Sequence, residues 1–122
     1  MPATADTPDA DVMLEAINAE LVALHRRYHH REPVSAKTQM LGGELLACVM
    51  GGVYTEVEKT MIELQRTPAV QDVRSAFQQA MEHKFIEIVE RLSGRRVEMF
   101  TSNSHVGPDI EIELFLLRPP VH

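Results

Sequence analysis

The feature that most constrains the fold of this chain is a long apolar stripe between residues 67 and 93. Hydrophobic side chains recur there every three or four residues, which places them on one side of an α-helix. The stripe consists of Val70, Val73, Phe77, Met81, Phe85, Ile88 and Leu92. Thr67-Pro68 predicts the start of this helix, with Thr67 as the cap, and Gly94 predicts its end. Such a one-sided helix must pack against another layer of structure.

Two further helices are predicted. Thr7-Pro8 repeats the cap-and-proline pattern, and the helix that it opens should end near Arg31, because Pro33 disfavours helix at the residue before it. Its apolar stripe consists of Met13, Ile17, Leu21, Leu24 and Tyr28. Residues 55–58, Thr-Glu-Val-Glu, form a capping box, which predicts another helix from there to about Arg66.

The remaining segments have strand patterns. Gly42-Gly43 lies between two strand-length runs and predicts a hairpin over residues 36–51 with a two-residue turn. Residues 96–101 alternate in part, and residues 110–114 alternate with a period of two, with turn residues between them. The sequence therefore predicts an α+β fold in the order α-β-β-α-α-β-β, with an antiparallel sheet of about four strands packed by three helices.

The length of 122 residues fits one domain. We expect a flexible N-terminal arm at residues 1–7, a single α+β domain at residues 8–118 and a C-terminal tail at residues 119–122. Cys48 is the single cysteine and lies in an apolar run, which is typical of a core residue in a reducing, cytoplasmic compartment. The first residues do not have the pattern of a signal peptide, and no apolar run approaches the roughly 20 residues that span a bilayer, so direct membrane insertion is not expected.

Charge and surface patterns indicate which partners to expect. A formal net charge of −6 argues against binding to nucleic acid, which needs concentrated Lys and Arg. Phe115-Leu116-Leu117 is apolar on both strand faces, which indicates that both sides of the sheet are covered in part. Three helices can cover one face, and a symmetric homodimer is the simplest way to cover the other.

Two histidines on the first helix are candidates for a metal site. His25 and His29 lie four residues apart, which puts both imidazoles on one side of a helix and is a common beginning of a zinc site. A third ligand would come from His105, Asp109 or a partner subunit. The alternative, and the commoner arrangement, is a polar flank that partly buries the rings. We therefore expect no cofactor, with zinc as the alternative.

Two other groups of polar residues are candidates for a ligand site. The loop before the last strand contains Ser102, Asn103, His105 and Asp109, a composition that could bind a small anion but is also what a tight turn requires. Ser35 and Lys37 point to the same side of a strand, where Lys37 could contact an anion. Nothing in the sequence lowers the pKa of Lys37 or supplies an oxyanion hole, so catalysis is not expected.

Glu111 and Glu113 share one face of the last strand. We expect that face to be solvated, with these carboxylates pairing with Arg95 and Arg96 across the hairpin.

A resemblance to a known family is carried by residues 33–37, 51–53, 55–59, 74–81, 92–97, 100–103 and 108–110. In these segments, and over residues 10–118 as a whole, the chain resembles the MpsC family. It departs from the family pattern at Arg31-Glu32, where glycines are expected, and at Glu44, where an aspartate is expected. The family is described as a subunit of a Na+-translocating system that generates membrane potential. The resemblance implies a small bacterial protein linked to a membrane cation or bicarbonate transport system, and it implies no catalytic residues.

Two functions are compatible with these patterns. The first is a non-enzymatic, dimeric accessory or adaptor protein that is cytoplasmic or held at the membrane by a transport-protein partner. The second is a sensor domain that binds a small ligand or a metal through His25, His29 and the loop from His105 to Asp109.

Overall fold

The computed structural model describes residues 8–120, which form three helices and four strands in the predicted order. The elements are α1 (Pro8–His29), β1 (Ser35–Leu41), β2 (Leu45–Gly51), α2 (Glu56–Glu63), α3 (Thr67–Ser93), β3 (Val97–His105) and β4 (Ile110–Leu117). All strands belong to one antiparallel sheet in the order β1-β2-β4-β3. The α+β fold is confirmed. The predicted arm at residues 1–7, with its cap Thr7, and residues 121–122 of the predicted tail lie outside the described residues.

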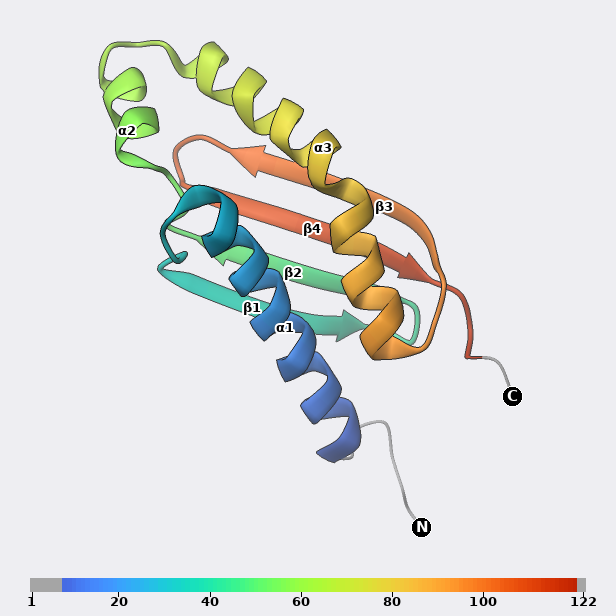
Figure 1. Cartoon of the computed structure of the whole chain (residues 1–122). Coiled ribbons are helices and arrows are strands. Elements are labelled where there is room, and N and C mark those ends of the chain that lie inside the picture. Colours follow the sequence, from blue (N-terminus) through green and yellow to red (C-terminus); the bar gives the residue numbers. More distant parts are fainter. Residues whose placement is uncertain (1–7, 121–122) are drawn as a thin grey trace.

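The described part of the chain has two layers. Helices α1 and α3 lie side by side on the same face of the sheet, with α1 against β1 and α3 against β3 (Figure 1). Helix α2 packs against α3 beyond one end of the sheet. Within residues 8–120, no element covers the opposite face of the sheet, which we call the open face (Figure 1).

The strand register divides the residues beneath the helices into an apolar half and a polar half. In the apolar half, Leu46 pairs with Phe115, and Phe115 pairs with Phe100 on β3. The Phe100 ring lies 4.9 Å from Phe115 and 6.0 Å from Phe85 on α3, between ring centroids. Large apolar side chains of this kind supply most of the favourable free energy of folding.

The polar half lies toward the end of the sheet nearest α2. Cys48 pairs with Glu113 and Met50 with Glu111. Next to them on β3 stand Ser102 and Ser104. The helix-facing side of the sheet therefore changes from aromatic and aliphatic residues to carboxyl and hydroxyl groups within a few residues of each strand.

Two local predictions, for a turn and for a helix cap, differ from the structure. The first hairpin turn has three residues, because Leu41 pairs with Leu45 and only Gly42 of the two glycines has a positive φ, at 71°. A two-residue turn at Gly42-Gly43 would instead pair Leu41 with Glu44. Thr67 is the first residue of α3 and not its cap. Arg66 is the N-cap, without a side-chain hydrogen bond, because the backbone turns at Gln65 with φ 62°.

The helix ends follow ordinary capping chemistry. The capping box is present: the Thr55 hydroxyl accepts from the Glu58 N–H, and the Glu58 carboxylate accepts from the Thr55 N–H. Gly94 ends α3 in the left-handed conformation, as predicted. Helix α1 ends at His29, two residues earlier than expected, because His30 adopts a positive φ of 60°.

Candidate functional site

A buried ion cluster occupies the polar half of the core, and it is made of Arg74, Glu58, Glu111 and Ser104. Arg74 on α3 is 3% exposed. Its guanidinium donates to Glu58 from Nε at 3.2 Å and from Nη2 at 3.1 Å. Nη1 donates to Glu111 and to Ser104, each at 3.1 Å. Arg74 thereby ties α2 and both strands of the second hairpin to α3, and all three of its nitrogens are used.

The charges in this cluster do not balance. Arg74 is one cation facing two carboxyl groups, and burial raises the pKa of Glu111 even though the neighbouring guanidinium favours its carboxylate. The aromatic ring of Tyr54 adds a stacking contact, because the Arg74 guanidinium carbon lies 4.6 Å from the ring centroid. The cluster is thus a fixed guanidinium enclosed by acceptors and one aromatic face.

Glu113 is a second buried carboxyl group, one strand repeat from Glu111. It is 1% exposed, and the Ser102 hydroxyl is hydrogen-bonded to both of its oxygens. Among the described residues no cation forms an ion pair with it. Burial, and then the charge of Glu111, raise the pKa of Glu113 to about 8. This group therefore holds a proton at neutral pH.

The expectation that Glu111 and Glu113 lie on a solvated face is wrong. Both are buried beneath the helices, and Arg95 and Arg96 bind elsewhere. Arg95 donates to the carbonyls of Arg118 and Gly43, and Arg96 faces Glu90 at 3.6 Å. The sequence did contain a signal, because both glutamates have the same strand parity as Phe115 and Leu117, which are core residues.

The predicted stripe of α3 is wrong at Val73, and its other positions are buried or packed against the core. Val73 is 58% exposed, whereas Arg74 and Gln78 are buried. The buried positions therefore run Val70, Arg74, Gln78, Met81 and Phe85. The stripe rotates toward Arg74 because the sheet beneath that turn presents carboxyl groups, which an apolar side chain would leave unpaired.

The two histidines of α1 are stacked on one another. His25 is 2% exposed, and its ring lies 4.0 Å from that of His29, between centroids. The His29 ring also contacts Phe77 edge-on, at 4.4 Å between centroids. Burial lowers the pKa of His25 to about 3 and also lowers that of His29. Both imidazoles are therefore neutral at pH 7.

The histidine pair has buried ring nitrogens without partners, as a ligand site can have, but the described residues supply no third metal-binding side chain. Both ring nitrogens of His25 are buried without a hydrogen-bond partner in the structure. Neither His105 nor Asp109 completes a metal site with them: among residues 8–120, no group of three or more His, Cys, Asp or Glu side chains could hold a metal ion. The stacked pair consists of one buried ring, His25, and one partly buried ring, His29, on the flank of the core.

Asp109 in the last turn has a structural partner. Its Oδ2 accepts from the Tyr54 N–H at 2.9 Å, and its carbonyl accepts from the Gly52 N–H at 3.1 Å. The Tyr54 hydroxyl donates to the carbonyl of His105 at 3.0 Å. These bonds fasten the segment after β2 to the turn between β3 and β4, next to the buried ion cluster.

The structure does not gather the predicted ligand residues at one place. Ser102 and Asp109 face the polar half of the core, whereas Asn103 and His105 are exposed on β3 and belong by register to the open face. Ser35 and Lys37 are exposed on β1, at the other edge of the sheet.

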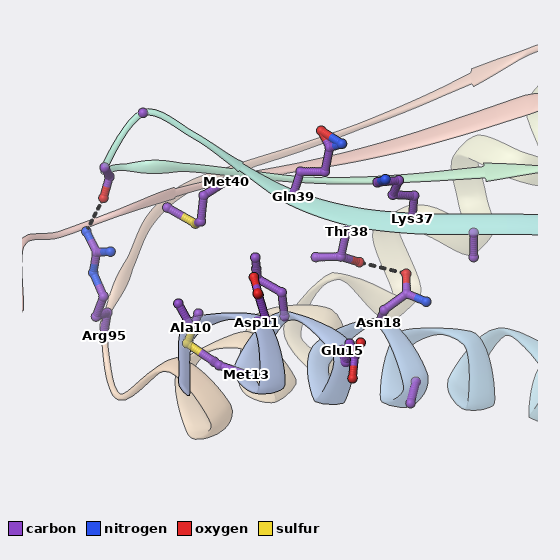
Figure 2. A pocket seen from close by; sticks show the side chains of 15 residues that line it. Ala10, Asp11, Met13, Glu15, Asn18, Lys37, Thr38, Gln39, Met40 and Arg95 are labelled. Atoms are coloured by element: carbon purple, nitrogen blue, oxygen red, sulfur yellow. Dashed lines mark hydrogen bonds between the residues drawn. The ribbon is translucent and has the colours of Figure 1, made fainter. Parts of the chain in front are cut away.

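A groove of about 1000 Å³ lies between α1 and β1 (Figure 2). Ala36, Met40 and Met13 line it with apolar atoms. A hydrogen bond from the Thr38 hydroxyl to Asn18, at 2.8 Å, crosses from the strand wall to the helix wall, and the bond from Arg95 to the Gly43 carbonyl, at 2.9 Å, closes the end at the hairpin turn. No spacing along the chain indicated this groove, because its shape depends on how α1 packs against β1.

The side chains around the groove are asymmetric in charge. Asp11 and Glu15 on α1 are exposed, and Asp11 rises toward the space beneath β1 (Figure 2). Lys37 and Gln39 extend from the side of β1 that faces away from α1 (Figure 2). The helix wall of the groove therefore carries two acidic side chains, whereas Ala36, Thr38 and Met40 of the strand wall are uncharged.

None of these places contains an activated nucleophile. Burial raises the pKa of the Cys48 thiol to about 11, so this cysteine is protonated at neutral pH. Ser102 donates to a carboxyl group that itself holds a proton, and all three nitrogens of Arg74 already donate to partners. In the described arrangement, Glu113 and Cys48 hold protons, and the charge of Arg74 is paired within the fold.

The fold and these sites define a two-layer α+β domain with a polar half-core and an uncovered sheet face. Residues 11–119 match the model of a family described as a Na+-translocating membrane potential-generating system, MpsC, and the chain belongs to this MpsC family. The resemblance seen in the sequence is confirmed. No curated protein and no solved structure matches the chain. No helix in residues 8–120 is long and apolar enough to cross a membrane.

Proposed function

We propose that this protein is a non-enzymatic, dimeric accessory or adaptor protein of a bacterial membrane transport system for a cation or bicarbonate. The link to a membrane system is supported by the family, whose description names Na+ translocation and membrane potential. The proposed localisation is cytoplasmic, with attachment to the membrane through a protein partner.

The observation that carries the proposal is the open face of the sheet. By register, its centre is formed by side chains of β2 and β4 that are all uncharged: Leu45, Ala47, Val49, Ile110, Ile112, Leu114 and Leu116. Val49 remains 40% exposed, and Met99 and Leu41 near the edges are 61% and 52% exposed. A contiguous apolar patch with polar edges has the anatomy of a protein interface.

A second copy of the chain is the occupant that fits this face best. With strands about 4.8 Å apart and about 3.3 Å per residue, the four-stranded face measures roughly 19 Å by 23 Å. The accessible area that two such faces bury, including the uneven surface of their side chains, approaches the roughly 1,200 Å² at which specific interfaces begin. A two-fold axis through an uncharged centre brings no like charges together. Face-to-face sheet packing is also an ordinary core arrangement.

Site-specific photocrosslinking tests the proposed dimer. A photoreactive residue at position 49, on the open face, should link two copies of the purified chain. The same group at position 87, on the exposed side of α3, is the matched control and should give no link between copies. Linking from position 87 but not from position 49 would contradict the proposed interface.

The membrane association has its own test. Washed membranes that contain the transport system should retain the purified chain, and membranes without that system should not. Equal retention by both membranes, or retention by neither, would reject the adaptor function even if the chain is a dimer.

One observation favours the alternative, a sensor that binds zinc or a small ligand through His25, His29 and the loop from His105 to Asp109. That observation is the pair of partnerless ring nitrogens on His25. If the alternative is correct, the purified chain should bind zinc with 1:1 stoichiometry, and replacing both His25 and His29 with Ala should abolish binding. Unchanged binding in that double variant would exclude the histidine pair.

A further inference from the structure

We propose that the groove between α1 and β1 binds an extended segment of a partner protein, which adds to the sheet as a fifth strand beside β1 and places basic side chains against Asp11 and Glu15. The inference deepens the proposed binding function by naming a partner surface. It does not depend on the dimer, because the groove and the open face are different surfaces.

The first reason is that β1 is a regular edge strand. It stands at the end of the sheet order and pairs with β2 through all seven of its residues without a bulge. Alternate N–H and C=O groups of such a strand point away from its neighbour and can bind an added strand. The opposite edge is less suitable, because β3 has an irregularity between Val97 and Met99.

The second reason is the shape of the space next to this edge. Five consecutive residues of β1, from Ala36 to Met40, line the groove opposite the α1 residues from Ala10 to Ala19. At about 3.3 Å per strand residue and 1.5 Å per helix residue, the two walls have matching lengths of roughly 13 Å. A groove between an edge strand and a helix holds four or five residues of extended chain, as in peptide recognition by strand addition.

The third reason is charge complementarity with a matching spacing. Asp11 and Glu15 lie four residues apart on α1, which separates them by about 6 Å along the helix. Alternate residues of an added strand lie about 6.6 Å apart and point to the same side. Among the described residues, neither carboxylate takes part in an ion pair. Two basic residues spaced i, i+2 would therefore meet both acids.

The other side of the added strand has a different neighbour. Its intervening residue would point away from α1 and lie next to Lys37 and Gln39 on the same side of the sheet (Figure 2). An acidic residue is favoured there by Lys37. The recognised pattern is therefore basic, acidic, basic at consecutive positions, with β-branched residues flanking it to favour an extended chain.

Nuclear magnetic resonance titration of the whole chain tests this inference. The probe is the peptide acetyl-Val-Arg-Glu-Arg-Val-amide, and the control probe is the charge-swapped acetyl-Val-Glu-Arg-Glu-Val-amide. The first peptide should shift backbone signals of residues 36–40 and 10–18 in a saturable manner and slow hydrogen exchange in β1. The affinity of the charge-swapped peptide should be lower by a factor of roughly ten or more, because two exposed charge pairs become repulsive.

Matched variants separate recognition from folding. Asp11→Asn combined with Glu15→Gln removes two exposed charges and should weaken binding of the first peptide roughly ten-fold at an unchanged melting temperature. Glu63→Gln combined with Glu82→Gln removes two exposed acids elsewhere and should leave binding unchanged. Any of four results overturns the inference: no shifts at millimolar peptide, equal binding of both peptides, shifts confined to residues of β2 and β4 on the open face, or full binding by the first double variant. A monomeric chain that still binds the peptide would reject only the dimer.

Discussion

At the scale of single residues, Arg74 has the greatest influence on this structure. Its side chain is buried against the sheet, and among the described residues it is the one cation in direct contact with the buried carboxyl groups of Glu58 and Glu111. A buried ion pair contributes little net stability compared with an apolar substitute, but removing one partner leaves the other charge buried and unpaired.

Replacing Arg74 with Met should therefore lower the free energy of unfolding by about 3–5 kcal/mol, measured by urea denaturation. Arg91→Met removes a cation from exposed ion pairs with Glu20 and Glu87 and should change the stability little. Neutralising the partners as well, in Arg74→Met with Glu58→Gln and Glu111→Gln, should recover much of the loss. A triple variant as unstable as Arg74→Met would show that packing, and not charge, is responsible.

The pH dependence of stability follows from His25 and Glu113. The folded pKa of His25 is about 3, below its ordinary 6.5, so the unfolded chain binds more protons between these values and stability falls as the pH drops below 6.5. The folded pKa of Glu113 is about 8, above its ordinary 4.5, so its contribution falls as the pH rises from 4.5 to 8. Each slope is at most about 1.4 kcal/mol per pH unit, and the two oppose each other between 4.5 and 6.5.

We therefore expect greatest stability between about pH 4.5 and 6.5, with a decline toward about pH 3 and toward about pH 8. Glu113→Gln should flatten the alkaline decline and leave the acid decline in place, whereas His25→Asn should do the reverse. Urea denaturation at each pH, taken as the difference between variant and wild type, cancels the groups common to both. An alkaline decline that persists in Glu113→Gln would contradict the assignment.

At the scale of elements, the sequence predicted what local patterns determine and missed what the pairing of distant segments determines. The order of helices and strands, the capping box at Thr55 and the stop at Gly94 follow from local spacing, and the structure confirms them. The buried ion cluster depends on which turn of α3 faces which residues of β4. For this reason Arg74, Glu111 and Glu113 were missed as core residues. Their spacing was visible in the sequence: Arg74 lies four residues after Val70 on a helix, and the two glutamates lie on the same strand face as Phe115.

Two glycines provide an element-scale prediction about the segments that flank the first hairpin. Gly42 and Gly52 have nearly equal positive φ, 71° and 67°. An added Cβ would meet nothing at Gly42, but at Gly52 it would lie 2.4 Å from Cγ2 of Val34. Gly42→Ala should cost about 1 kcal/mol of unfolding free energy through backbone strain, and Gly52→Ala should cost about 1–3 kcal/mol more.

Combining Val34→Ala with Gly52→Ala should recover part of the additional cost, because the nearest clashing atoms belong to the Val34 side chain. Thermal denaturation of the four chains is sufficient for this comparison. Equal stability of Gly42→Ala and Gly52→Ala would show that the segment before β1 relaxes without cost.

At the scale of the whole molecule, the structure has one layer of helices for a sheet with two faces. The apolar residues of β4 predicted this arrangement from the sequence, since Leu114 and Leu116 alternate with buried Phe115 and Leu117. The sequence could not specify which surface covers the second face, because that depends on the shape and charge of the assembled sheet. The candidate ligand residues are likewise split between opposite faces, which no spacing along the chain could reveal.

The central claim is that a second copy of the chain covers the open face, and sedimentation equilibrium of the whole chain tests it most directly. Wild type should have twice the mass of the 13.8 kDa chain at micromolar concentration. Val49→Lys, at a 40% exposed position of that face, should be a folded monomer, because a dimer would bury the charge. Val12→Lys, at a 62% exposed position of α1, should remain a dimer. A monomeric wild type, or a Val49→Lys variant that remains a dimer, would contradict this account.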